Sequence, residues 1–122
     1  MIKTLDLYEE AMDICDDVLV PTNELKIQLT LKMSMALHDL SSMPMDAWVC
    51  GKKVLLLAEK YNAISHEDLK HSQIEMLQVL RHHVSMLEVY LSTHKDNKET
   101  KSGRKYCDLN SLMEEENDDG NR

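Results

Sequence analysis

The feature that most constrains the fold is the long run from Ser65 to Thr93, in which apolar side chains recur at helical spacing. Ser65 can cap the first turn of such a helix, and Asp68 would face the positive end of its dipole. The inner apolar stripe consists of Leu69, Leu77, Leu80, Val84, Leu87 and Leu91. The stripe is widened by Ile74, Met76, Val79, Met86, Val89 and Tyr90. Because only a narrow polar strip remains, we expect a central helix that neighbours cover on two sides.

Part of this stripe also has the spacing of a coiled-coil seam, through Leu77, Leu80, Val84, Leu87 and Leu91. Two heptads are fewer than the three or four that establish a coiled coil from sequence. We therefore expect this stripe to pack inside one subunit, and we keep a homodimer through the 65–93 helix as an alternative.

Residues 25–37 are open to two interpretations. Apolar and polar residues alternate strictly here, which is the period of a half-buried strand. The residue types, mainly Leu, Met, Lys, Gln and Ala, favour a helix instead, and a hairpin of two strands is marginal without a larger sheet. We predict a helix from Thr22 or Asn23 to about Leu40, covered from both sides, with the hairpin as the alternative.

Two more helices complete the predicted domain. The first spans residues 4–19 and ends before Pro21, because proline breaks a helix. The third begins at Pro44 and runs to about residue 62. It contains Gly51, which indicates either a bend or the close approach of a neighbouring helix. We therefore predict an all-α domain over residues 1–93, a small bundle of about four helices with a long C-terminal helix.

Beyond this domain the apolar pattern stops and the charge changes sign twice. Residues 94–105 contain five basic and two acidic residues, and the chain turns acidic after residue 107. Such composition predicts a disordered charged tail over residues 94–122. Within it, residues 106–113 would align their apolar side chains on one face if they became helical. This segment is therefore a candidate to fold on binding into a partner's apolar groove.

The first helix carries a strongly acidic face with no basic residue between positions 4 and 19 to offset it. Such a run is often only a solvated surface, but it also suits docking to a basic partner. Our candidate partner-binding residues are therefore Glu9, Glu10, Asp13, Asp16 and Asp17 on this helix, and Tyr106, Leu109, Leu112 and Met113 in the tail.

Composition and motifs argue against several classes of function. The net charge of −8 disfavours direct binding of nucleic acid. Glu67, His71, Glu75 and His82 share a helical face and could suggest a metal site. The chain has, however, no HExxH motif and no pair of carboxylate-x-x-His motifs on separate helices. The chain also lacks a GxSxG elbow and a glycine-rich phosphate loop. We therefore expect no metal, no cofactor and no enzymatic activity.

The cysteines and the apolar segments bear on the compartment. Cys15, Cys50 and Cys107 include no CxxC pair, which favours a reducing compartment, and we expect Cys50 to be a buried structural thiol. No stretch of 18 apolar residues is present, and we expect no signal peptide, because the first residues lack a basic stretch followed by an uninterrupted apolar run. A cytoplasmic protein is expected, a nuclear one also fits, and no membrane contact is predicted.

These observations favour a non-catalytic protein–protein interaction module, an adaptor or regulatory protein that uses its acidic helix and a short motif in its tail. The first alternative is an acidic inhibitor that mimics nucleic acid and blocks a DNA- or RNA-handling enzyme. The second is a homo-oligomeric structural or assembly subunit built on the 65–93 helix.

Overall fold

The computed structural model describes residues 2–65, 68–94 and 99–113, and every regular element in these ranges is helical. The helices are α1 (Ile2–Val18), α2 (Glu24–Asp39), α3 (Pro44–Ser65), α4 (His71–Thr93) and the short 3₁₀ helix η2 (Lys105–Cys107). The all-α prediction is thus confirmed, and residues 25–37 are helical, not a hairpin. None of the helices in the described ranges is long and apolar enough to span a membrane.

The sequence predicted the start of α2 but not that of α4. The side chain of Asn23 accepts a hydrogen bond of 2.9 Å from the N–H of Leu25, which caps α2. Ser65, the expected cap of the long helix, is instead the last residue of α3. The start of α4 is held by Gln73, whose side chain accepts from the N–H of Lys70 at 2.8 Å. Lysine is not a usual capping residue, so the sequence pattern did not indicate this boundary.

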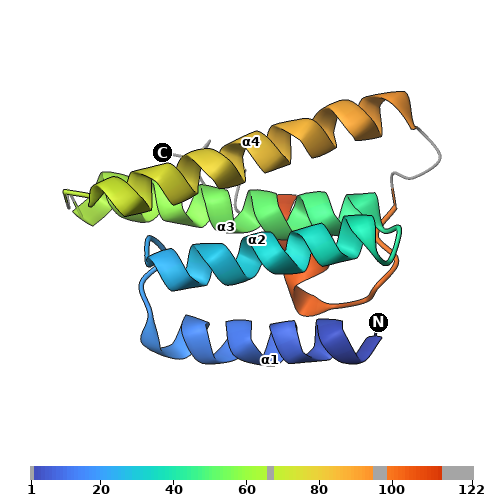
Figure 1. Cartoon of the computed structure of the whole chain (residues 1–122), viewed down its shortest axis with the longest axis horizontal. Coiled ribbons are helices and arrows are strands. Elements are labelled where there is room, and N and C mark those ends of the chain that lie inside the picture. The colour runs from blue at the N-terminus through green and yellow to red at the C-terminus, as the bar shows by residue number, and fades with distance from the viewer. Residues whose placement is uncertain (1, 66–67, 95–98, 114–122) are drawn as a thin grey trace.

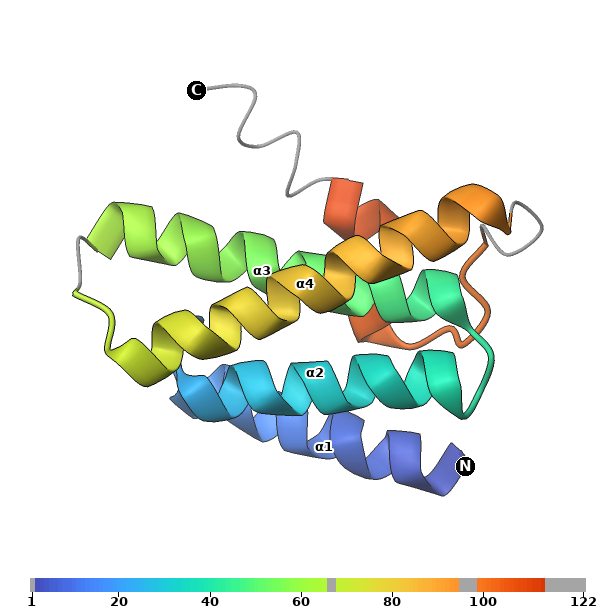
Figure 2. The same cartoon turned by 45° about the horizontal axis from the view of Figure 1, so that its top comes forward.

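The four helices run alternately in opposite directions (Figure 1). Helix α2 lies at the centre, because it packs against α1, α3 and α4, and α3 packs against α4. Helix α1 packs mainly against α2 and lies at the edge of the molecule. Residues from the C-terminal part of the chain lie between α1 and α3 (Figures 1 and 2).

Gly51 allows three helices to come close together at one point of the core. A Cβ atom added to this residue would lie 3.1 Å from Cγ2 of Val84 on α4 and 3.6 Å from Oγ of Ser34 on α2. The first distance is shorter than an ordinary van der Waals contact. Of the two explanations offered by the sequence, close approach of a neighbouring helix is therefore confirmed.

The apolar surface of α4 is covered on one face only. The buried residues of α4 are the five of the suggested seam, Leu77, Leu80, Val84, Leu87 and Leu91. They pack within the chain, as expected. The widening residues Ile74, Val79, Met86 and Val89 are exposed, as are Leu25, Met35 and Leu40 on α2. The expected cover on two sides is therefore wrong for the widening residues of α4, whereas α2 packs against α1, α3 and α4 and is covered from more than one side, as predicted.

Part of the predicted tail is packed against the helices. Within residues 99–113, Cys107 and Leu112 are each only 1% exposed. Here the structure differs from the expected disorder, because the two buried side chains anchor a segment whose charge pattern alone indicated no packing. Residues 95–98 and 114–122 lie outside the described residues.

Candidate functional site

The two groups of residues predicted to bind partners meet between α1 and α3. We call residues 99–113 the C-terminal segment. We call Asp6, Glu9, Glu10, Asp13, Asp16 and Asp17 the acidic face of α1. The C-terminal segment crosses the space between α1 and α3 (Figure 1), and it makes hydrogen bonds to both helices.

Arg104 makes the first contact of this segment with α1. Its guanidinium Nη1 lies 2.8 Å from Oδ1 of Asp6 and 3.3 Å from Oε2 of Glu9. The side chain is only 13% exposed. Burial disfavours the charged form, but the hydrogen bonds to the two carboxylates outweigh this effect and raise the pKa of Arg104. The arginine is thus held between two acidic side chains one helical turn apart.

Lys105 and Tyr106 contact the next carboxylates along the same helix. Lys105 pairs with Asp13, and this hydrogen bond, followed by that of Tyr106, lowers the pKa of Asp13. The hydroxyl oxygen of Tyr106 lies 2.7 Å from Oδ1 of Asp13 and 2.8 Å from Oδ2 of Asp16, so the two carboxylates share its single hydrogen. Asp16 in turn pairs with Lys26 at 2.8 Å. Each of the two carboxylates around the phenol therefore has a lysine that offsets its charge.

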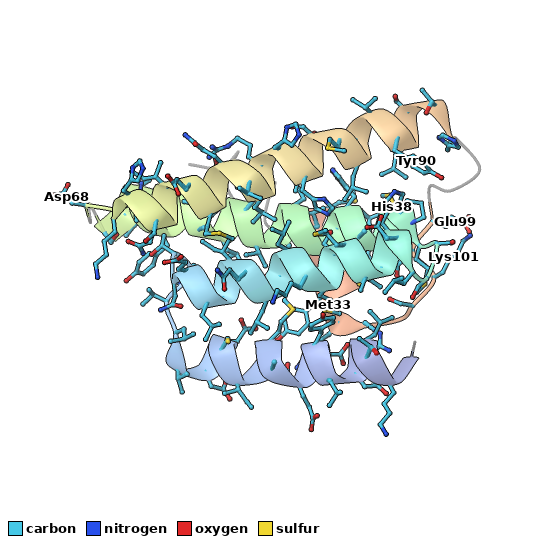
Figure 3. The ribbon with its side chains drawn as sticks, viewed as in Figure 1. Met33, His38, Asp68, Tyr90, Glu99 and Lys101 are labelled. Atoms are coloured by element: carbon cyan, nitrogen blue, oxygen red, sulfur yellow. The ribbon has the colours of Figure 1, made fainter. Side chains whose placement is uncertain are left out.

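On the other side, a buried carboxylate of α3 holds the backbone of the C-terminal segment. Asp46 is fully buried in the first turn of α3. Its two oxygens accept from the N–H groups of Lys101 and Ser102, at 2.7 and 2.8 Å. A buried carboxylate needs such partners, because an unsatisfied charge in the protein interior is costly. Lys101 is labelled in Figure 3, at the end of the molecule where the segment begins.

Further along, the segment is held by packing and by one hydrogen bond to α3. Cys107 and Leu112 bury their side chains, and the Nζ of Lys53 on α3 donates to Oγ of Ser111 at 2.6 Å. Along the chain, residues 104–106 thus lie between the residues held by Asp46 and the two buried anchors, Cys107 and Leu112.

The predicted binding residues differ in their positions. Glu9, Asp13 and Asp16 contact residues 104–106, whereas Glu10 and Asp17 have no hydrogen bond or ion pair within the described ranges. In the tail, Tyr106 contacts Asp13 of α1 through its hydroxyl. Leu112 is buried, Leu109 is half-buried and Met113 is exposed. The two surfaces predicted from the sequence to bind separate partners therefore bind each other.

The residues that join these surfaces were not predicted. Arg104 and Lys105 lie in the stretch predicted to be disordered, and no local pattern marks Asp46 as a contact. The sequence did contain one signal for this contact, because residues 94–105 are net positive and the acidic face of α1 is negative. Such complementarity indicates attraction, but it does not locate a contact between residues so far apart in the chain.

The histidines and cysteines are the remaining candidate reactive groups. No group of three or more His, Cys, Asp or Glu in the described part of the chain could hold a metal ion. His71 lies 2.7 Å from Glu75, and both are exposed, while Glu67 lies outside the described residues. All three cysteines are free and buried. Burial raises the pKa of Cys50, as predicted for a structural thiol, and that of Cys107 to about 11.

Comparisons of the chain with protein-family models and curated proteins, and of its fold with solved structures, found no match.

Proposed function

We propose that the chain is a non-catalytic protein-interaction module whose docking surface is the acidic face of α1. The proposal is carried by one observation, the fit of Arg104, Lys105 and Tyr106 onto the carboxylates of α1. The partner would be a protein segment that presents two cations next to an aromatic residue. In the intact chain, residues 104–106 occupy this surface and act as an internal competitor.

The energetics of the contacts allow such an exchange. Solvent-exposed ion pairs contribute about 0–1 kcal/mol each, and salt screens them. The pair of Lys105 with Asp13 is exposed, whereas Arg104 is 13% exposed and should be the most firmly held of the three residues. A partner can therefore displace the side chains of residues 104–106 while Cys107 and Leu112 remain packed. Glu10 and Asp17 are exposed and can attract an approaching basic segment.

The same contacts make the two alternatives less favourable. A nucleic-acid mimic would present an open row of charges, whereas Asp6, Glu9, Asp13 and Asp16 already face cations or a phenol. An assembly subunit built on the 65–93 helix would use the seam of α4, whose five leucine and valine side chains are buried within the chain.

The proposal is tested by binding of a labelled peptide that copies residues 99–106, measured by fluorescence anisotropy. The full chain is compared with a variant carrying Arg104→Glu and Lys105→Glu, in which the internal competitor is repelled from α1. A matched control carries Lys32→Glu and Lys70→Glu, which changes the net charge equally at two exposed positions elsewhere. A scrambled peptide of the same composition is the second control.

We expect the first variant to bind the native peptide about tenfold more tightly than the unaltered chain, since a competing segment has been removed. Binding should weaken as salt is added. The proposal is contradicted if the control variant gains the same affinity, or if the scrambled peptide binds as well as the native one.

A further inference from the structure

A groove lies between α2 and α4, away from the acidic face of α1. Its volume is about 440 Å³. Helix α4 diverges from α2 toward its C-terminal end, as both views show (Figures 1 and 2). The apolar lining of the groove consists of Leu31, Met35, Val79, Met86 and Leu87. Because Met35, Val79 and Met86 are between 44% and 57% exposed, folding leaves this lining accessible.

The polar lining of the groove contains no lysine or arginine. It consists of His38, Asp39, His82, His83 and Tyr90. Asp39 is the one carboxylate among them, and it is exposed. An anionic ligand would therefore meet a carboxylate and no fixed cation, while a cationic ligand would meet a charge of the opposite sign.

Hydrogen bonds define which groups His83 can offer. The hydroxyl of Ser34 donates to the backbone oxygen of Ala47 at 2.7 Å, which uses its one hydrogen. In its 2.8 Å contact with Ser34, the Nε2 of His83 must therefore be the donor. Burial lowers the pKa of His83, so its other nitrogen carries no proton at neutral pH. The ring can offer the groove a hydrogen-bond acceptor but no further N–H donor.

Tyr90 adds an aromatic wall that is held in place. Its ring meets His38 edge-on, with centroids 4.8 Å apart, and stacks on His94 at 3.9 Å. Figure 3 shows His38 and Tyr90 projecting toward each other from α2 and α4. Aromatic rings attract cations through their faces and pack well against apolar groups.

We propose that the α2–α4 groove binds a small amphipathic amine, a protonated amino group on an aromatic or alkyl body. The apolar walls receive the body, and Asp39, the acceptor side of His83 and the ring of Tyr90 receive the cation. The volume falls in the range of small-molecule sites, about 300–1,000 Å³, whose walls are mainly apolar with a few polar groups. The charge of −8 on the whole chain favours a cation over an anion.

The test uses three ligands of matched size, 4-phenylbutylamine, 4-phenylbutanol and 4-phenylbutyrate, each titrated into the full chain at pH 7.5. Amide chemical shifts measured by NMR report both affinity and location. For a ligand of this size we expect a dissociation constant of about 1 mM for the amine. We expect the alcohol to bind about fivefold more weakly and the carboxylate more weakly still, with shifts confined to the facing parts of α2 and α4.

Two variants make the test specific. Asp39→Asn should remove the preference of the amine over the alcohol, whereas Asp108→Asn, at an exposed position in the C-terminal segment, should leave it unchanged. Val79→Arg places a cation in the groove and should reverse the order, so that the carboxylate binds best. The proposal fails if the carboxylate binds the unaltered chain as tightly as the amine, or if the shifts lie elsewhere. Shifts of the groove residues that depend on protein concentration without ligand would also overturn it, because a second copy would then be the occupant.

Discussion

Two of the spaces beside the packed helices differ in their contents, because the described chain fills one of them and leaves the other open. The space between α1 and α3 is lined on one side by carboxylates and contains the C-terminal segment. The groove between α2 and α4 is lined mainly by apolar side chains and is open. The contrast lies in the chemistry of the walls, because the C-terminal segment offers cations and a phenol that match the first space and not the second.

This contrast separates what stabilises the fold from what is free to bind. Leu112 and the Asp46 contacts should contribute to the stability of the whole chain, since they are buried. The contacts of residues 104–106 with α1 are more exposed and should contribute less. The exposed side chains of the α2–α4 groove, Met35, Val79 and Met86, should contribute least. Substitutions can test this order.

The largest effect is expected at the apolar anchor of the C-terminal segment. Leu112→Ala should lower the free energy of unfolding by about 3 kcal/mol, because it opens a cavity at a side chain that is 1% exposed. The neighbouring Met113 is 51% exposed, and Met113→Ala should cost less than about 0.5 kcal/mol. Urea unfolding of both variants measures the difference. Equal effects would show that the segment is not packed as described.

A smaller effect is expected at the buried carboxylate of α3. Asp46→Ala should destabilise the chain by about 2 kcal/mol, because the N–H groups of Lys101 and Ser102 lose their acceptor. Hydrogen exchange at these two amides should accelerate in the variant. The exposed Asp39 serves as the control, since Asp39→Ala should change neither quantity. Unchanged exchange at both amides in the Asp46 variant would contradict the assignment of this anchor.

The hydroxyl of Tyr106, which contacts the acidic face of α1, should contribute less to the stability of the chain than Asp46. Tyr106→Phe removes one hydroxyl that donates to Asp13 and Asp16, and we expect a loss of about 1 kcal/mol in the free energy of unfolding. Tyr8→Phe is a suitable control, because the Tyr8 hydroxyl makes no hydrogen bond within the described residues. If both substitutions have the same effect, the hydroxyl of Tyr106 does not stabilise the contact between the C-terminal segment and α1.

The smallest effect is expected from the titration of His83 beside the groove. Burial lowers its pKa below the ordinary 6.5, and this outweighs the opposite influence of Asp39. As the pH falls below 6.5, the unfolded chain therefore binds a proton more readily than the folded chain, and stability decreases through the lowered pKa. His83→Gln should remove this part of the pH dependence, whereas His71→Gln, at an exposed position, should not. Thermal unfolding at several pH values measures it.

The sequence predicted the helices well where one face of an element is buried. The stripe of Leu77, Leu80, Val84, Leu87 and Leu91 repeats at helical spacing, and these residues are the buried ones of α4. The start of α4 was missed because it depends on Gln73, whose side chain also donates to the backbone oxygen of Thr22 at 2.9 Å. Such a contact between distant segments leaves no local pattern.

The candidate site was predicted only in its separate parts. The unbalanced charge on α1 indicated Glu9, Asp13 and Asp16, and apolar spacing indicated Tyr106 and Leu112. That these parts bind each other depends on the path of the chain after α4, which no local pattern determines. The α2–α4 groove was missed for a related reason, since Val79 and Met86 are as apolar as core residues and only the divergence of α4 leaves them exposed.

The most direct test of the central claim, that residues 104–106 cover the acidic face of α1, is the pKa of Asp13. It can be followed by NMR of the carboxyl carbon during a pH titration of the full chain and of a variant with Lys105→Gln and Tyr106→Phe. The hydrogen bonds of Lys105 and then Tyr106 should hold this pKa below 3.8 in the unaltered chain and let it rise in the variant. An Asp13 that titrates at the same pH in both proteins would contradict the account.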